Sequence, residues 1–310
     1  MRIVFMGTPD FAVPTLESLL ESEHQVVGVV TQPDKPKGRG GKVQMTPVKE
    51  LAVKYDVPVH QPVRIKEEES YEVLKQWNPD AIVVVAFGQI LPKRILDLPQ
   101  YGCINVHASL LPKLRGAAPI QWAVIEGEKT SGVTTMYMDE GLDTGDMLLK
   151  EEIPLEDTET GGSLHDKLMI LGGPLILRTL EGLQKGTISR TPQNHSEHTY
   201  AKMLDKQLGK LDFTKPASEI ERLIRGLNPW PSAYTSLVGK TLKIWEARVV
   251  PAPEQGAPGE IVETAKSYIT VQTGKDALQI LSLQLEGKKR MSTEAFLRGV
   301  PLEQGTVLGK

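Results

Sequence analysis

The amino-acid sequence predicts an α/β protein of two domains, a Rossmann-like domain built on a parallel sheet and a small OB-like β-barrel after it. The chain has 310 residues, which is long for a single hydrophobic core. Its first part alternates apolar, β-branched runs with segments of helical spacing, which is typical of a parallel sheet covered on both faces. Its last part carries short alternating runs separated by glycine and proline, as small antiparallel barrels do.

Strands and helices alternate in the first part. The expected strands are apolar runs at 2–7, 25–31, 80–87, 102–109 and 132–139. The segments with helical spacing span 13–22, 47–56, 117–126 and 163–183. The turn after the first strand, GTPDF, is not the G-x-G-x-x-G of a dinucleotide-binding domain, which disfavours a dehydrogenase.

A polar stretch without sustained periodicity, residues 190–206, is expected to link the two domains. The first domain is then expected at 1–189 and the second at 207–310, with a helix at 217–227. From residue 207 onward, 14 lysine and arginine residues stand against 11 acidic ones, whereas the preceding part has 22 against 28. The second domain is therefore the more basic, which favours a polyanionic partner there.

The bulk composition indicates a globular protein without covalent cross-links. It is 40% hydrophobic and 24% charged, and no segment approaches the run of about 20 apolar residues that a membrane helix needs. The start, MRIVFMGTPDF, has no signal-peptide pattern. The single cysteine, Cys103, excludes a disulfide within the chain, and we expect a cytoplasmic location.

Asn105 and His107 are candidate catalytic residues. They lie two positions apart at the end of an expected strand, and strand side chains alternate, so both point to one face. Open α/β sheets bind ligands at the carboxyl ends of their parallel strands. An amide donor and an imidazole there can stabilise a developing oxyanion and move a proton. The alternative is that both side chains only cap the strand through backbone hydrogen bonds.

Four acidic residues follow the next strand, within residues 139–146 (DEGLDTGD). A carboxylate at this edge could orient His107 or accept a proton through water. An acidic surface turn is the alternative, because aspartate and glycine are common turn residues. We expect no metal site, since no cysteine or histidine lies nearby and the spacing is not that of a calcium-binding loop.

The run NVHASLLPKLRGAAPIQWAV, followed by a strand and GLDTGD, resembles the folate-dependent formyltransferase family. The similarity begins at VFMGTPDFAVPTL and TQPDKPKGRG and continues through VVVAFGQILP and the Asn-x-His segment. It extends to NPWPSAY and GKKRMS near the end. The resemblance therefore covers nearly all of the chain, with a weak match in the polar stretch.

The resemblance implies roles for individual residues. Those that match the family's catalytic trio are Asn105, His107 and Asp143. Those that match its folate-contacting turn are Ser109, Leu110, Leu111 and Pro112. Those that lie where relatives line the pterin pocket are Phe87, Ile90 and Leu91. A flat heteroaromatic ring needs an apolar slot, but ordinary core packing is the alternative for these last three.

A basic segment indicates the acceptor of the formyl group. Residues 33–42 (PDKPKGRGGK) form neither a helix nor a central strand, because prolines and glycines separate their basic side chains, Lys35, Lys37, Arg39 and Lys42. A flexible basic loop suits phosphate contacts, and a solvated surface loop is the alternative. The resemblance implies that this loop reaches into the acceptor end of a tRNA, with Arg39 the residue of most interest.

The resemblance implies an enzyme that moves a formyl group from 10-formyltetrahydrofolate, a co-substrate, to the α-amino group of initiator methionyl-tRNA. We expect no metal, no membrane and no obligate protein partner. The nearest alternative is a sugar-nucleotide formyltransferase with the same folate donor, against which the basic loop argues. A non-catalytic RNA-binding protein is the other, against which the intact set of Asn105, His107 and Asp143 argues.

Overall fold

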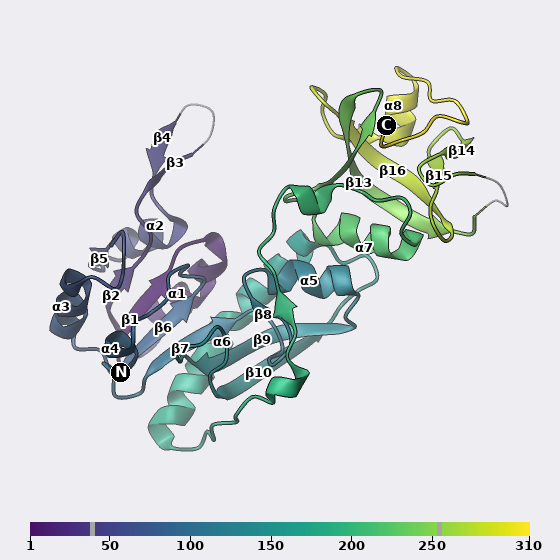
Figure 1. The fold of residues 1–310 in the computed structure, drawn as a ribbon. Helices are drawn as coiled ribbons and strands as arrows, with labels where there is room; N and C mark the ends of the chain where they lie inside the picture. Colours follow the sequence, from purple (N-terminus) through teal and green to yellow (C-terminus); the bar gives the residue numbers. More distant parts are fainter. Residues whose placement is uncertain (38–40, 253–255) are drawn as a thin grey trace. The chain divides into compact units, whose positions relative to one another are not determined.

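The computed structural model describes residues 1–37, 41–252 and 256–310 (Figure 1). The chain divides into two compact units. The first consists of Met1–Pro119, Thr130–Pro154 and His165–Ala201. The second consists of Ile120–Lys129, Leu155–Leu164 and Lys202–Lys310. Two short segments from the middle of the sequence thus belong with the C-terminal residues, and the expected domain limits at 189 and 207 stay predictions.

In the described part of the chain, the first unit is built on a seven-stranded sheet of order β10-β9-β7-β6-β1-β2-β5. The parallel strands are β1 (Arg2–Gly7), β2 (Gln25–Val30), β5 (Val59–His60), β6 (Ala81–Val85) and β7 (Cys103–His107). Next to β7 runs the antiparallel β9 (Thr130–Tyr137), paired in turn with the antiparallel β10 (Met147–Pro154). The predicted parallel sheet is confirmed, except that the strand expected at 132–139 runs antiparallel, as β9, and forms a hairpin with β10 at one edge.

Burial explains which strands the sequence predicts best. All five residues of β6 (AIVVV) are buried, and β1 is buried from Ile3 onward, because both strands are covered on both faces. β10 alternates half-buried with exposed residues from Leu149 onward, so its sequence does not form an apolar run. This strand was not predicted from the sequence.

Helices connect these strands. They are η1 (Asp10–Ala12), α1 (Val13–Leu20), α2 (Pro47–Lys54), α3 (Glu68–Trp77), α4 (Lys93–Leu96) and α6 (Gly161–Lys185), the last beginning in the second unit. α2 begins where Thr46 Oγ1 accepts a 3.1 Å hydrogen bond from the N–H of Lys49. The sequence did not predict α3, because only Ser70 and Leu74 of this charged helix are buried. Within the described residues, no helix is both long and apolar enough to cross a membrane.

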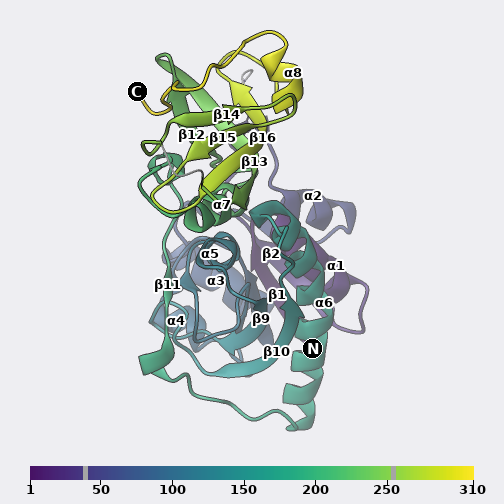
Figure 2. The same cartoon turned by 90° about the vertical axis from the view of Figure 1, so that its right-hand side faces the viewer.

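The second unit is an antiparallel sheet with helices (Figure 2). Its strands, in the order β12-β13-β16-β15-β14, are β12 (Ala233–Leu237), β13 (Lys240–Val250), β16 (Ala277–Leu285), β15 (Ile269–Gln272) and β14 (Ile261–Thr264), and β17 (Met291–Ser292) pairs with β16. Its helices are α5 (Pro119–Glu126, from Ile120), α7 (Ala217–Gly226) and α8 (Thr293–Leu297). Ile220 and Ile224 of α7 pack with Ile244 and Leu283 of the sheet in one core. The predicted C-terminal antiparallel-sheet domain is confirmed.

The predicted basic loop forms part of a two-stranded hairpin, β3 (Lys35–Lys37) and β4 (Lys42–Gln44), in which Lys37 is opposite Lys42 (Figure 1). Lys35 is exposed. Arg39, with its neighbours at 38 and 40, lies outside the described residues.

Candidate active site

Three polar side chains singled out in the sequence meet at the end of β7. Asn105 Nδ2 lies 3.5 Å from Oδ1 of Asp143, and His107 Nδ1 lies 3.8 Å from Oδ2 of the same carboxylate. Asn105 and His107 thus reach one acidic group, as their alternation on the strand predicts. The structure therefore brings together side chains that stand 38 positions apart in the sequence.

The backbone fixes the ring of His107, which is buried. Its Nε2 lies 2.9 Å from the carbonyl oxygen of Leu114. Because a carbonyl oxygen only accepts, Nε2 must carry the hydrogen. In the neutral ring the lone pair is then on Nδ1, the nitrogen that faces Asp143. When the ring takes up a second proton, that nitrogen becomes an N–H donor beside the carboxylate.

The acidic residues of the loop after β9 make different contacts. Asp139 organises the loop itself, because its Oδ1 accepts a 2.7 Å hydrogen bond from Thr144 Oγ1. Asp146 pairs with Arg190 at 3.2 Å. Asp143 turns inward with a left-handed φ of 53° and reaches Asn105 and His107. Asp139 therefore has the contacts of an ordinary turn residue, and the role of Asp143 toward His107 stays a prediction.

Thr134 of β9 anchors the turn at residues 109–112. Its hydroxyl donates a 2.7 Å hydrogen bond to the carbonyl oxygen of Ser109 and accepts one of 3.2 Å from the N–H of Leu111. Ser109 and Leu111 are buried, whereas Leu110 and Pro112 are partly exposed. Of the four residues expected to contact folate, Leu110 and Pro112 therefore have accessible apolar surface, and the contact itself stays a prediction.

Phe87, Ile90 and Leu91 do not form one surface. Phe87 and Leu91 are buried in a core that includes Val4 and Met6, which agrees with ordinary core packing. Ile90 is 83% exposed. Their expected place beside a pterin ring stays a prediction.

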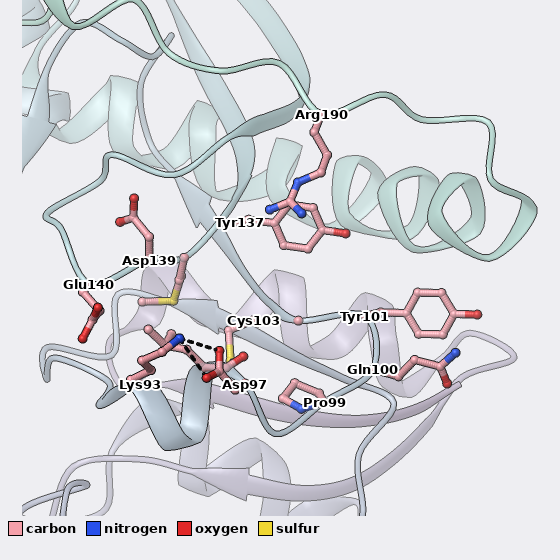
Figure 3. Close-up of a pocket in the computed structure, with 13 residues that line it drawn as sticks. Lys93, Asp97, Pro99, Gln100, Tyr101, Cys103, Tyr137, Asp139, Glu140 and Arg190 are labelled. Atoms are coloured by element: carbon pink, nitrogen blue, oxygen red, sulfur yellow. Dashed lines mark hydrogen bonds and ion pairs between the residues drawn. The ribbon is translucent and has the colours of Figure 1, made fainter.

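A cavity of about 400 Å³ opens at the start of β7, the strand end opposite His107 (Figure 3). Its lining includes Lys93, Asp97, Tyr101, Tyr137, Glu140 and Arg190. In Figure 3 the guanidinium of Arg190 lies over the ring of Tyr137, with 4.1 Å from its Cζ to the ring centroid. Cys103 also lines this cavity, and burial raises the pKa of its thiol to about 12. The residues lining it do not include Asn105, His107 or Asp143.

The short segment Leu114–Gly116 holds both His107 and Asp143 through its backbone. The carbonyl oxygen of Leu114 faces Nε2 of His107, and the N–H of Gly116 donates a 2.8 Å hydrogen bond to Oδ2 of Asp143. No side-chain chemistry marks these two positions, so sequence reasoning overlooked them.

That segment is held in turn by the polar stretch expected to be a linker. β11 (Tyr200–Ala201) pairs in parallel with β8 (Arg115–Gly116). The N–H of Leu114 donates 2.9 Å to Oγ1 of Thr199, and the N–H of Arg115 donates 2.9 Å to its carbonyl oxygen. Residues 199–201 therefore belong to the framework of the site.

Comparisons with known proteins extend over almost the whole chain. The family described as formyl transferase matches residues 1–180, and that described as formyl transferase, C-terminal domain, matches residues 203–301. The methionyl-tRNA formyltransferase of Agathobacter rectalis is 58% identical over 306 residues, which cover 99% of both chains. That of Clostridioides difficile is 52% identical over 309 residues, which cover 100% of both.

Solved structures share the fold at low identity. The N-formyltransferase from Helicobacter canadensis, in complex with folinic acid and dTDP-3-aminofucose, superimposes with a TM-score of 0.66 at 20% identity, covering 90% of this chain and 99% of that one. HypX from Aquifex aeolicus, in complex with tetrahydrofolic acid, gives a TM-score of 0.62 at 18% identity, covering 100% of this chain and 51% of that one. With both family matches and relatives above 50% identity along its length, the chain belongs to the formyl transferase family.

Proposed function

We propose that this chain transfers the formyl group of 10-formyltetrahydrofolate to the α-amino group of methionyl-tRNA, giving N-formylmethionyl-tRNA for translation initiation. The observation that carries the proposal is the 58% identity, over 99% of both chains, with the methionyl-tRNA formyltransferase of Agathobacter rectalis. The two matched family domains agree with it. The acceptor is the initiator tRNA, and the proposed location is the cytoplasm.

In the proposed reaction the neutral amine attacks the formyl carbon. A bond forms between that carbon and the amine nitrogen, the bond to N10 of the folate breaks, and N10 takes up a proton. Asn105 Nδ2 and the imidazolium of His107 stabilise the negative charge on the formyl oxygen. Asp143 holds the imidazolium and assists removal of the amine proton. The approach of both donors to one carboxylate, at 3.5 and 3.8 Å, supports these roles.

The two substrates are proposed to use separate parts of the chain. The folate lies along the turn at 109–112 and the segment with Phe87, Ile90 and Leu91, within the domain at 1–189. The tRNA contacts the basic residues of the segment at 33–42, Lys35, Lys37, Arg39 and Lys42, and the domain at 207–310. The excess of basic over acidic residues after position 207 supports the second assignment.

A sugar-nucleotide acceptor is the alternative that the experiment must separate. The structure from Helicobacter canadensis holds a dTDP-linked amino sugar, but at 20% identity the likeness shows the fold alone. The full-length relatives above 50% identity are methionyl-tRNA formyltransferases.

The test is an acceptor competition with the purified full-length chain. The chain is mixed with 10-formyltetrahydrofolate and either charged initiator tRNA or dTDP-3-aminofucose, and the products are resolved by mass. We expect formylated methionyl-tRNA and no formylated sugar. Formylation of the sugar alone would favour the alternative, and no folate consumption with either acceptor would remove the proposed activity.

A further inference from the structure

Gln193 is a buried residue in an exposed stretch. All residues from Thr191 to Tyr200 are exposed except Gln193, whose exposed fraction is 6%. Burying a primary amide is costly unless all its polar atoms find partners. The partners of this side chain therefore indicate why the chain places it there.

The amide group of Gln193 is bonded to the loop that carries Asp143. Its Nε2 donates two hydrogen bonds, one to the carbonyl oxygen of Asp143 and one to that of Gly145, each of 2.8 Å. The amide group of Gln193 thus spans the two residues that flank Thr144. Asp143 has a left-handed φ of 53°, a conformation that needs support in a residue with a side chain. One of the two hydrogen bonds is made to Asp143 itself, and the other holds the chain two residues further on.

Arg115 fixes the orientation of that amide. Its Nε and Nη2 donate to Oε1 of Gln193 at 3.0 and 2.8 Å, and Nη1 and Nη2 each lie 3.3 Å from Nδ1 of His195. Because the guanidinium only donates, Oε1 must face Arg115 and Nε2 must face the loop. The positive charge also polarises the amide and strengthens its donor end.

The polar stretch holds the same loop by its backbone. Thr191 and Met147 exchange two backbone hydrogen bonds of 2.9 Å, one in each direction. Together with the Gln193 contacts, these bonds fix the loop from Asp143 to Met147. Arg115 precedes Gly116, whose N–H donates to Oδ2 of Asp143. Residues 115–116 and 191–193 therefore hold the backbone and the carboxylate of Asp143 from two sides.

We propose that Gln193 is a positioning residue for Asp143 and that Arg115 holds Gln193 in the orientation this requires. The proposal rests on the proposed formyl transfer, because the position of Asp143 matters to turnover only if this carboxylate acts on His107. Thr191, Gln193 and residues 199–201 are then part of the catalytic framework, and not only of a connection.

The experiment compares full-length variants in formylation of charged initiator tRNA. Gln193→Ala removes the contacts, and Gln193→Glu keeps the volume and the acceptor for Arg115 but cannot donate to the two carbonyl groups. Ser196→Ala is the matched control in the same stretch, since within the described residues its hydroxyl donates to Asn194, at 2.8 Å, and not to the loop with Asp143. We expect kcat to fall about 10- to 100-fold in both Gln193 variants, with KM for either substrate changed less than about threefold and the control unchanged.

A double-mutant cycle with Asp143→Asn separates positioning from general destabilisation. If Gln193 acts through Asp143, adding Gln193→Ala to Asp143→Asn should lower kcat by less than about threefold. Fully additive losses, an unchanged kcat in a folded Gln193 variant, or a loss confined to KM would each overturn the proposal.

A measurement by NMR tests the positioning role of Gln193 even if the proposed function is wrong. If the wild-type chain forms no formylmethionyl-tRNA, the function fails and kinetics say nothing of Gln193. The ¹⁵N signals of the His107 ring, assigned by their absence in His107→Ala, should then still shift in Gln193→Glu in the same direction as in Asp143→Asn. Signals unchanged from wild type in Gln193→Glu would overturn the positioning role.

Discussion

The backbone N–H of Gly116 donates a 2.8 Å hydrogen bond to Oδ2 of Asp143 at a position where any side chain would be strained. Gly116 has a φ of 106°, and a Cβ there would lie 2.7 Å from the ring of Tyr200 and 2.8 Å from the carbonyl oxygen of Ala201. The close pairing of β8 with β11 and the hydrogen bond to Asp143 therefore both depend on the absence of a side chain at residue 116.

Gly116→Ala is expected to lower both stability and turnover, because it must push β11 away and move the donor of Asp143. We expect a lower Tm and a fall in kcat of at least about tenfold. Gly186→Ala is the control, since Gly186 has a φ of 65° but open space around it. It should cost about 1 kcal/mol of stability and leave kcat unchanged. Equal kinetic effects of the two substitutions would contradict a role for the Gly116 contact.

The trio of Asn105, His107 and Asp143 should act as a unit. Asn105→Ala removes a proposed oxyanion donor, which typically costs about 3–4 kcal/mol in the transition state. Once His107 is gone, much of the function of Asp143 is gone too, so His107→Ala with Asp143→Asn should be little slower than the worse single variant. Turnover and melting temperature are measured on the same proteins. Rate losses that are additive, or that simply follow unfolding, would remove the trio from the mechanism.

The basic loop at residues 33–42 is expected to bind the tRNA and not the folate. Arg39→Ala should weaken catalysis on tRNA by about 1.5–3 kcal/mol, the usual value of a charge-assisted hydrogen bond, and leave folate binding nearly unchanged. Lys35→Ala should cost less, because an exposed ammonium is a poorly fixed charge. The measurements are kcat/KM for charged tRNA and Kd for the folate. A matching loss of folate affinity in Arg39→Ala would assign the loop to the other substrate.

Cys103 should make the alkaline stability of the chain depend on pH. Burial raises the pKa of its thiol from 9.0 to about 12, so the unfolded chain loses the proton first as pH rises. The contribution of this thiol to the free energy of unfolding is fully present below pH 9. Above pH 9 it falls by up to about 1.4 kcal/mol per pH unit, until the thiol of the folded chain also ionises. Cys103→Ala should therefore show a shallower decline between pH 9 and 11 in chemical denaturation. Parallel declines in the two proteins would show that another group is responsible.

The sequence by itself determined four strands of the parallel sheet, β1, β2, β6 and β7, but not the two-residue β5, and it determined the shared face of Asn105 and His107. Both follow from local geometry, because strand side chains alternate with a period of two and a fully covered strand must be apolar throughout. β7 shows the alternation, with Asn105 and His107 on one face, and β6 shows the strand that is apolar throughout. The motifs along the chain likewise identified the family, since they are continuous in sequence.

The residue pattern alone left open which acidic residue of the 139–146 loop faces His107, and the resemblance singled out Asp143. Only the tertiary structure decided what holds Asp143 there. Asp139 and Asp143 stand in similar local sequence. In the folded chain, however, the carboxylate of Asp143 accepts a hydrogen bond from the N–H of Gly116, and its carbonyl oxygen accepts one from Gln193. Arg115 and Gln193 are 78 positions apart, and a hydrogen bond over that separation leaves no periodic signal in the sequence. A buried polar contact depends on where the folded chain places the two partners. The polar stretch around Gln193 therefore resembles a linker in the sequence, and only the fold shows its hydrogen-bond partners.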